Sequence, residues 1–379
     1  MHFRDLKKQY GMLKEPIDSA IKSVLSNTDF ISGKQVSELE QQLADYVGVK
    51  HCITCGNGTD AITLALMVWN IGKGDAVFVP DFTFFSSGEC PAYEGATPIF
   101  VDVCEDTFNM SSESLENAII RVKEEGKLSP KVIIAVDLFG QPADYEKIRP
   151  IAKKYGLKIL EDGAQGFGGE LNGKKACSFG DVATTSFFPA KPLGCYGDGG
   201  AIFTDDDYEA NLLRSLRVHG KGEDKYDNVR LGMNSRLDTL QAGVLQVKLK
   251  AFEEYELEEV NKAAKRYTAL LNGVVKTPLV PDNMLSSWAQ YSILLKDKNQ
   301  RDGMQNFLKE KGIPSMIYYR KPMHLQKAFA DDICVYTDLS VTESICERVL
   351  SLPIHPYITP EEQDMVVKVI REYLHKGGL

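Results

Sequence analysis

The stretch "VATTSFFPAKPLGCYGDGG", residues 182–200, begins with a short run of β-forming residues and continues as a turn-rich segment with a single basic residue, Lys191. Lysine side chains usually stay in contact with water, and this loop of aromatic, proline, glycine and small residues offers little solvation. Poor solvation disfavours the charged ammonium and lowers the pKa of a lysine. The stretch therefore predicts a strand followed by a poorly solvated loop, and it raises the question of what Lys191 does there.

Strand-like and helical segments alternate on both sides of this stretch. Short runs rich in β-forming residues occur at 76–79, 98–101, 132–136, 157–160 and 182–187. Most are separated by helix-length intervals, such as 111–125 and 143–156. Parallel strands need such crossover connections. We therefore predict an α/β fold with a mainly parallel sheet covered by helices on both faces.

The length of 379 residues exceeds what one hydrophobic core normally supports. Residues 235–272 carry apolar residues at helical spacing, which predicts a helix long enough to bridge two lobes. Beyond them the pattern predicts strands at 289–295 and around 314–319, and helices near 300–311 and 361–375. We expect a large ligand-binding domain over residues 1–250 and a smaller α+β domain over residues 251–379.

Composition limits the classes of function. With 43% hydrophobic and 26% charged residues, no long apolar run and no secretory signal pattern, the chain is expected to be soluble and cytoplasmic, without a membrane partner. A net charge of -9 argues against sequence-independent binding to nucleic acid. The eight cysteines are scattered, which favours free thiols. Cys52 and Cys55 form a C-x-x-C inside a strand-like run without a second pair, so we expect core residues and no metal site.

Three polar groups are predicted to lie at the carboxyl ends of strands, where ligands of open α/β sheets bind. Asp162 follows the strand at 157–160, with Gln165 one turn later, and Ser186 ends the strand that precedes Lys191. The third is the turn at 56–59, which leads from a strand into a helix whose first amides favour a phosphate. Taken singly, each has an ordinary interpretation as a helix cap, a turn residue or a solvated loop residue.

Together these groups match what pyridoxal 5′-phosphate requires. Its phosphate needs a cradle of amides and hydroxyls, its aldehyde needs a lysine able to lose a proton, and its ring nitrogen stays protonated beside a carboxylate. Lys191 and Asp162 would supply the last two. An aromatic ring from "PDFTFFSS", which holds Phe82, Phe84 and Phe85, would cover the cofactor, although core packing remains the default for two of the three.

Several longer motifs resemble one family. The segments "NGTDA", "EDGAQGFGG", "SFFPAKPLGCYGDGGA", "GMNSRLDTLQA" and "LPIHP" are similar to those of the DegT/StrS-type nucleotide-sugar aminotransferases, which are fold-type I pyridoxal-phosphate enzymes. The resemblance runs nearly from end to end of the chain. It implies the aspartate aminotransferase-like fold, with a mainly parallel sheet in the large domain and a smaller α+β domain at the C-terminus.

The resemblance also implies roles for particular residues. Lys191 would bind the cofactor covalently and carry protons, Asp162 would pair with the ring nitrogen, Gln165 would approach the ring hydroxyl, and Phe84 would stack on the ring. The implied phosphate ligands are Gly58, Thr59, Ser186 and, from a neighbouring subunit, Asn234. A homodimer with shared active sites follows from that last role.

Some relatives carry histidine in place of Lys191 and act as dehydratases, so lysine here implies amino transfer. Glutamate would be the donor and a keto group on a nucleotide-linked sugar the acceptor. The sequence motifs are most similar to those of the branch that aminates C3 of a UDP-linked 3-keto-N-acetylglucosaminuronic acid for surface polysaccharide such as O-antigen. In that branch the arginine of NSRLD, here Arg236, would contact the sugar carboxylate. A neutral UDP- or dTDP-linked 3-keto or 4-keto sugar is the alternative.

One segment departs from the family pattern. Where relatives read His-Tyr-Pro, this chain has Tyr318 in place of the histidine and Arg320-Lys321 in the proline region. Tyr318 and His324 are therefore candidate substrate contacts, while His219 and His355 are expected to position the lobes.

Two other classes compete with this prediction. Glycine-rich segments such as "GCYGDGG" suggest a Rossmann-type enzyme, but no G-x-G-x-x-G motif follows the first strand. A non-catalytic member with a regulatory or scaffolding role would keep the fold without the chemistry. The complete set of Lys191, Asp162 and Gln165 favours an enzyme over both.

Overall fold

The computed structural model describes residues 1–224, 226–329 and 336–375. Its centre is a seven-stranded sheet with the order β1-β9-β8-β5-β4-β2-β3. The strands are β1 (His51–Cys55), β2 (Asp75–Pro80), β3 (Thr97–Val101), β4 (Ser129–Val136), β5 (Lys158–Asp162), β8 (Val182–Ser186) and β9 (Gly200–Thr204). Neighbouring strands are parallel except at β9, which runs antiparallel to both β1 and β8. The predicted α/β fold with a mainly parallel sheet is confirmed.

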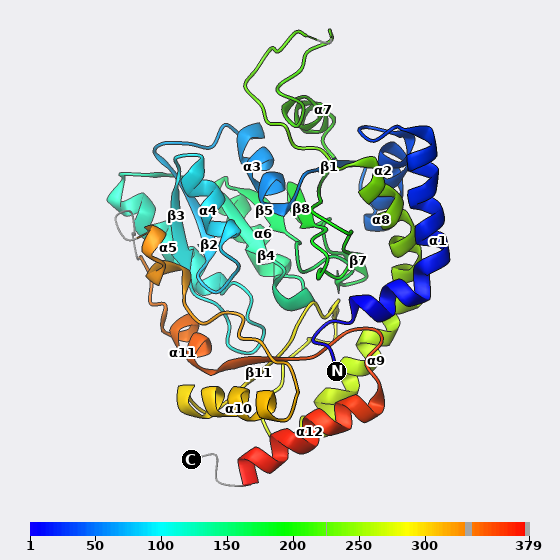
Figure 1. Ribbon diagram of the computed structural model, residues 1–379. Coiled ribbons are helices and arrows are strands. Elements are labelled where there is room, and N and C mark those ends of the chain that lie inside the picture. The colour runs from blue at the N-terminus through cyan, green and yellow to red at the C-terminus, as the bar shows by residue number, and fades with distance from the viewer. Residues whose placement is uncertain (225, 330–335, 376–379) are drawn as a thin grey trace.

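Both faces of this sheet are buried, as parallel sheets require. In β4, Val132, Ile134 and Val136 pack on one side, and Ile133 and Ala135 pack on the other. Helices α3 (Gly58–Val68), α4 (Ser86–Tyr93) and α7 (Asp207–Leu216) cover the first side. Helices α2 (Lys34–Val47), α5 (Ser112–Glu125), α6 (Tyr145–Tyr155) and α8 (Thr239–Ala251) cover the second. The long helix α1 (Leu6–Asn27) runs beside α8 along the outer edge in Figure 1.

A second apolar cluster belongs to the C-terminal part of the chain, drawn in yellow to red in Figure 1. It is built around α9 (Leu257–Leu271), β11 (Tyr291–Leu294), α10 (Lys298–Glu310), β12 (Val349–Leu352) and α12 (Pro360–His375), with β11 and β12 antiparallel. Helix α11 (Ser340–Arg348) and a small sheet of β10 (Met284–Leu285), β6 (Glu170–Leu171) and β7 (Lys174–Lys175) connect this part to the rest. A domain division after residue 250 stays a proposal.

Two local expectations were wrong. Residues 314–319 form no strand: Met316 makes one isolated bridge to Ser351, and the chain then turns away so that Tyr318 and Tyr319 face the interior of the molecule. The helix expected from residue 235 begins only at Thr239, because the preceding residues pack against the turn before α3. It passes through one π-helical turn, Phe252–Glu256, before α9.

The cysteines agree with their expected role. The seven described cysteines are free thiols, and Cys52 and Cys55 are buried in β1, while Cys334 lies outside the described residues. Across the described ranges, no helix combines the length and the apolar character needed to cross a bilayer.

Candidate active site

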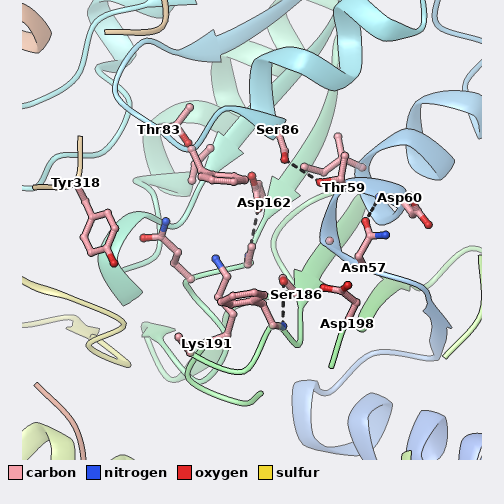
Figure 2. Close-up of a pocket in the computed structure, with 18 of the residues that line it drawn as sticks. Asn57, Thr59, Asp60, Thr83, Ser86, Asp162, Ser186, Lys191, Asp198 and Tyr318 are labelled. Carbon is pink, nitrogen blue, oxygen red and sulfur yellow. Dashed lines mark hydrogen bonds between the residues drawn. The ribbon is translucent and has the colours of Figure 1, made fainter. Parts of the chain in front are cut away.

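One cavity of about 630 Å³ lies at the carboxyl ends of the parallel strands, where an open α/β sheet binds its ligands. The end of β4 and the segments at and after the ends of β1, β2, β5 and β8 contribute to its wall, and Gln290, Tyr318 and Tyr319 from the C-terminal part line the remaining side. Figure 2 shows Lys191 and Asp162 pointing into the same space, with Tyr318 across from them and Asn57, Thr59 and Ser186 at the other end. The topology thus brings together residues that lie far apart in the sequence.

Lys191 lies half-buried in the loop between β8 and β9, and its backbone amide donates to Phe188 O at 2.8 Å. Desolvation by the surrounding protein lowers the pKa of its amine to about 8, and Arg4 adds to this effect, while Asp162 opposes it. At pH 7.5 roughly one amine in four would then be neutral, against about one in a thousand for an ordinary lysine. The amine expected from the sequence to be reactive is therefore also one whose pKa is lowered toward neutral pH.

Asp162 ends β5 and is buried. Its Oδ2 accepts a hydrogen bond from Ser87 Oγ at 2.7 Å, and its Oδ1 accepts a longer one from the Ala164 amide at 3.2 Å. Ser87 in turn lies 3.1 Å from Thr83 Oγ1. These contacts fix the carboxylate and leave one side of it on the cavity wall, where it can face a positive group of a ligand.

The turn after Asp162 can follow its path only because small residues fill it. A Cβ on Gly166 would lie 2.3 Å from Asp137 Cβ, and a Cβ on Gly163 would lie 2.6 Å from Cys177 Sγ. Behind the turn, Glu161 accepts hydrogen bonds from the amides of Phe179 and Gly180. The close packing of this layer holds Asp162 and the following Gln165 in one orientation.

The turn from β1 into α3 forms the other end of the cavity. Asn57 caps the helix by accepting from the Asp60 amide at 2.8 Å, and Thr59 Oγ1 lies 2.8 Å from Ser86 Oγ (Figure 2). Gly58 approaches so closely that a Cβ there would lie 2.8 Å from Ser186 Cβ. The first amides of a helix have no partner within it, so this corner offers amides and hydroxyls to an anion.

Aromatic rings and an amide border the remaining wall. Gln165 Oε1 accepts from the Phe139 amide at 2.8 Å, and its Nε2 donates to Tyr319 Oη at 3.0 Å. The Tyr319 ring lies 6.4 Å from that of Phe84, which is 53% exposed. Phe84 thus lines the cavity with an exposed ring, and its stacking on a flat cofactor ring stays a prediction.

Comparison with known proteins agrees with this geometry. Residues 12–371 match the DegT/DnrJ/EryC1/StrS aminotransferase family. The chain belongs to this family.

Among curated relatives, the chain is 43% identical to the UDP-2-acetamido-2-deoxy-3-oxo-D-glucuronate aminotransferase of Pseudomonas aeruginosa over 94% of its length and 96% of that protein. It is 40% identical to a UDP-N-acetyl-3-dehydro-alpha-D-glucosamine 3-aminotransferase of Acidithiobacillus ferrooxidans, over 98% and 97%. The chain is also 49% identical to a DegT DnrJ EryC1 StrS aminotransferase from Brucella abortus whose crystal structure is known. The two structures match with a TM-score of 0.96 over 98% of this chain and 99% of that one. The fold-type I architecture and an aminotransferase function are thereby confirmed, and the cofactor of this aminotransferase is pyridoxal 5′-phosphate, as predicted.

The cavity of this aminotransferase collects most of the residues predicted for its site. Those on its wall are Gly58, Thr59, Phe84, Asp162, Gln165, Ser186, Lys191 and Tyr318. Asn234, Arg236 and His324 lie outside the cavity of their own chain. Because Asn234 was predicted to act on a neighbouring subunit, its exposed position agrees with that role, which stays a prediction.

His324 is buried and engaged elsewhere. Its Nδ1 lies 2.7 Å from Asp81 Oδ2, its backbone amide donates to Asp81 Oδ1 at 2.8 Å, and its Nε2 lies 3.3 Å from Glu343. The hydrogen bond to Asp81 raises the pKa of His324, which favours the cationic form. This ion pair joins the segment after β2 to the C-terminal part. Among the described residues, His324 is not part of the cavity wall, and a contact between His324 and a substrate stays a prediction.

Sequence reasoning missed several residues of the wall. Tyr319 directly follows the predicted Tyr318, and burial raises the pKa of its hydroxyl, so that it remains a donor. Asp198 and Gln290 also line the cavity. Asp198 lies in the glycine-rich segment after Lys191, and that segment could have indicated it as a site residue. Nothing near Gln290 in the sequence indicates a site.

Proposed function

We propose that this aminotransferase moves an amino group from glutamate to C3 of UDP-2-acetamido-2-deoxy-3-oxo-glucuronate, in the synthesis of a surface polysaccharide such as O-antigen. The observation that carries the chemistry is the single cavity that holds the Lys191 amine, the Asp162 carboxylate and the amide-rich corner before α3. The substrate rests on likeness, because the Pseudomonas aeruginosa relative of that name matches along almost the whole chain. The cytoplasmic location stays a prediction.

The residues present fit pyridoxal 5′-phosphate. Gly58, Thr59 and Ser186 would hold its phosphate, Phe84 would cover one face of its ring, and Asp162 would pair with the ring nitrogen. When bound, the cofactor withdraws electrons from the carbon that loses or gains a proton. Gln165 is placed to approach the ring hydroxyl, while its contacts with Phe139 and Tyr319 fix its orientation.

The residues of the chain then carry out the proton steps. Lys191 Nζ would bind the cofactor aldehyde and, once the donor amine had displaced it, would take a proton from one carbon and return it to the next. An amine whose pKa lies near 8 can do both at neutral pH, because its charged and neutral forms are both populated. Tyr319 and Gln165 border the cavity on one side of this amine.

A homodimer with shared sites is part of the proposal. Of the described residues on the cavity wall, Lys191 is the only cation, whereas Asp60, Asp162 and Asp198 are acidic. A cofactor phosphate, a nucleotide diphosphate and a sugar carboxylate would meet too little positive charge there. A second copy that brings Asn234 and Arg236 to this corner would supply what is missing.

The position of those two residues supports exchange between copies. Ser235 Oγ donates to Asp60 Oδ2 at 2.6 Å and accepts from the Gly56 amide at 2.9 Å, which fixes the segment behind the phosphate corner. Asn234 is exposed, and within the described residues Arg236 has no ion-pair partner. The loop before them, with exposed Leu231, projects from the body of the molecule above α7 in Figure 1.

Mixing two defective chains tests the shared site. Lys191→Ala removes the amine and Asn234→Asp places a negative charge at the neighbour's phosphate, so each homodimer is expected to be nearly inactive. A mixed dimer, purified through two different tags, regains one intact site and about half of the wild-type kcat. A mixed dimer as inactive as its parents would show that Asn234 serves its own chain.

The acceptor is tested with a panel of UDP- and dTDP-linked 3-keto and 4-keto sugars, each supplied with glutamate and scored by the mass of the aminated product. The uronate is expected to react with the highest kcat/KM. Arg236→Met should lower that value about 10²-fold through loss of a charged contact, and should change the value for the neutral 3-keto sugar less than threefold. Equal losses on both sugars would contradict a contact between Arg236 and the carboxylate, and a product from neutral sugars alone would establish the alternative.

A further inference from the structure

The first five residues form a short segment that crosses from the C-terminal part to the lysine loop. Met1 packs against the C-terminal apolar cluster, and the Phe3 ring meets the Tyr318 ring edge-on at 6.2 Å. Asp5 caps α1 by accepting from the Lys8 amide at 2.8 Å. The residue between them, Arg4, is thus held at both sides.

Arg4 contacts the backbone of the lysine that the proposed function uses. Its Nη2 donates to Lys191 O at 2.9 Å and, at 3.4 Å, to Pro192 O. The buried Lys248 donates to Gly194 O in the same loop. Arg4 and Lys248 therefore contact three backbone carbonyls of one loop, and neither side chain is among the described residues of the cavity wall.

The charges around this loop are few, and their effects can be separated. Burial lowers the pKa of Arg4 to about 10, and the buried Glu256 opposes that shift, so Arg4 stays protonated at neutral pH. Glu256 itself accepts from Gln9 and Tyr357. The nearby His355 is neutral, because burial and then Arg4 lower its pKa to about 4.

Lys191 thus lies between opposite charges. Asp162 faces its amine from the end of β5 and stabilises the ammonium, whereas Arg4 on the N-terminal segment destabilises it. Asp60 and Asp198 are the other charged groups on the cavity wall. Lys248, although it anchors the same loop, has no comparable effect on the Lys191 amine and shares Glu256 with Arg4 instead.

We propose that Arg4 is a positioning residue for Lys191, which anchors the main chain of the lysine loop and keeps a positive charge near the amine at neutral pH. An ammonium has no lone pair, so only the neutral amine attacks an aldehyde. A guanidinium that stays protonated at neutral pH favours the neutral amine without taking part in proton transfer there. The side chain thereby assists attachment of the cofactor from outside the cavity.

This inference rests on the proposed function, in which Lys191 binds the cofactor aldehyde. The test uses the full-length protein freed of cofactor and follows the capture of added pyridoxal 5′-phosphate by absorbance in a stopped-flow instrument from pH 6.5 to 10. The pH midpoint of the capture rate reports deprotonation of the amine. Arg4→Gln keeps a hydrogen-bond donor without the charge, Arg4→Lys keeps the charge, and Lys248→Met loosens the same loop at Gly194.

For Arg4→Gln the pH midpoint of the capture rate is expected to rise by about half a pH unit. At pH 7.5 the variant should then capture the cofactor about threefold more slowly than wild type, and near pH 10 the two rates should be equal. Arg4→Lys should keep the wild-type midpoint, and Lys248→Met should change the rate equally at all pH values if it changes it at all. An unshifted midpoint in Arg4→Gln, or a loss equal at every pH, would overturn the role of the charge. Unimpaired covalent capture by Lys191→Ala would instead contradict the proposed function.

Discussion

Replacing Lys191 with alanine is expected to lower kcat about 10⁴-fold and to abolish covalent binding of the cofactor. The same nitrogen binds the aldehyde and carries the proton, so its loss removes a nucleophile and an acid-base group together. The apolar loop around it should tolerate the smaller side chain, because Arg4 and Lys248 contact backbone carbonyls of the loop and not the amine. The variant is therefore expected to fold.

Two measurements separate this expectation from a general loss of structure. Borohydride reduction of the loaded wild type, followed by peptide mapping, should locate the pyridoxyl group on Lys191, and the variant should show no labelled peptide. Thermal unfolding of the two cofactor-free proteins should agree within a few degrees. A label on another lysine, or turnover near the wild-type rate in Lys191→Ala, would contradict the assignment.

Replacing Asp162 with asparagine is expected to lower kcat about 10²- to 10³-fold while the cofactor still binds. The amide keeps nearly the shape of the carboxylate, and its oxygen can still accept from Ser87. It carries no charge, however, and cannot keep a facing ring nitrogen protonated. A carboxylate in contact with such a nitrogen raises the pKa of the nitrogen by roughly 1 to 3, and asparagine would not. The carbon acid at the reacting centre then loses its proton more slowly.

A matched control separates charge at this position from charge elsewhere in the cavity. Asp198→Asn removes a carboxylate from the same wall, and its effect on kcat should be far smaller than that of Asp162→Asn. The deuterium isotope effect with α-deuterated glutamate should rise in Asp162→Asn, because proton removal becomes rate-limiting. Equal losses in both variants, or an unchanged isotope effect, would mean that Asp162 has no special role at the ring.

Much of the architecture was readable from local patterns. The β-rich runs at 76–79, 98–101, 132–136, 157–160 and 182–187 all became strands of the main sheet, because strands buried on both faces carry continuous apolar residues. The segment at 314–319 carries similar residues and formed no strand. Its path depends on packing against β12 and the cavity, which no local pattern records.

The sequence by itself determined that a strand would deliver Lys191, that Asp162 and Gln165 would follow another strand, and that residues 56–59 would open a helix. Each of these follows from contacts between residues near one another in the chain. Only the tertiary structure decided that Tyr319 would bond Gln165, that His324 would pair with Asp81 away from the cavity, and that Arg4 would lie behind the lysine loop. These pairs are separated by 154, 243 and 187 residues, and the free energy that joins them comes from burial of the whole core, which local spacing does not encode.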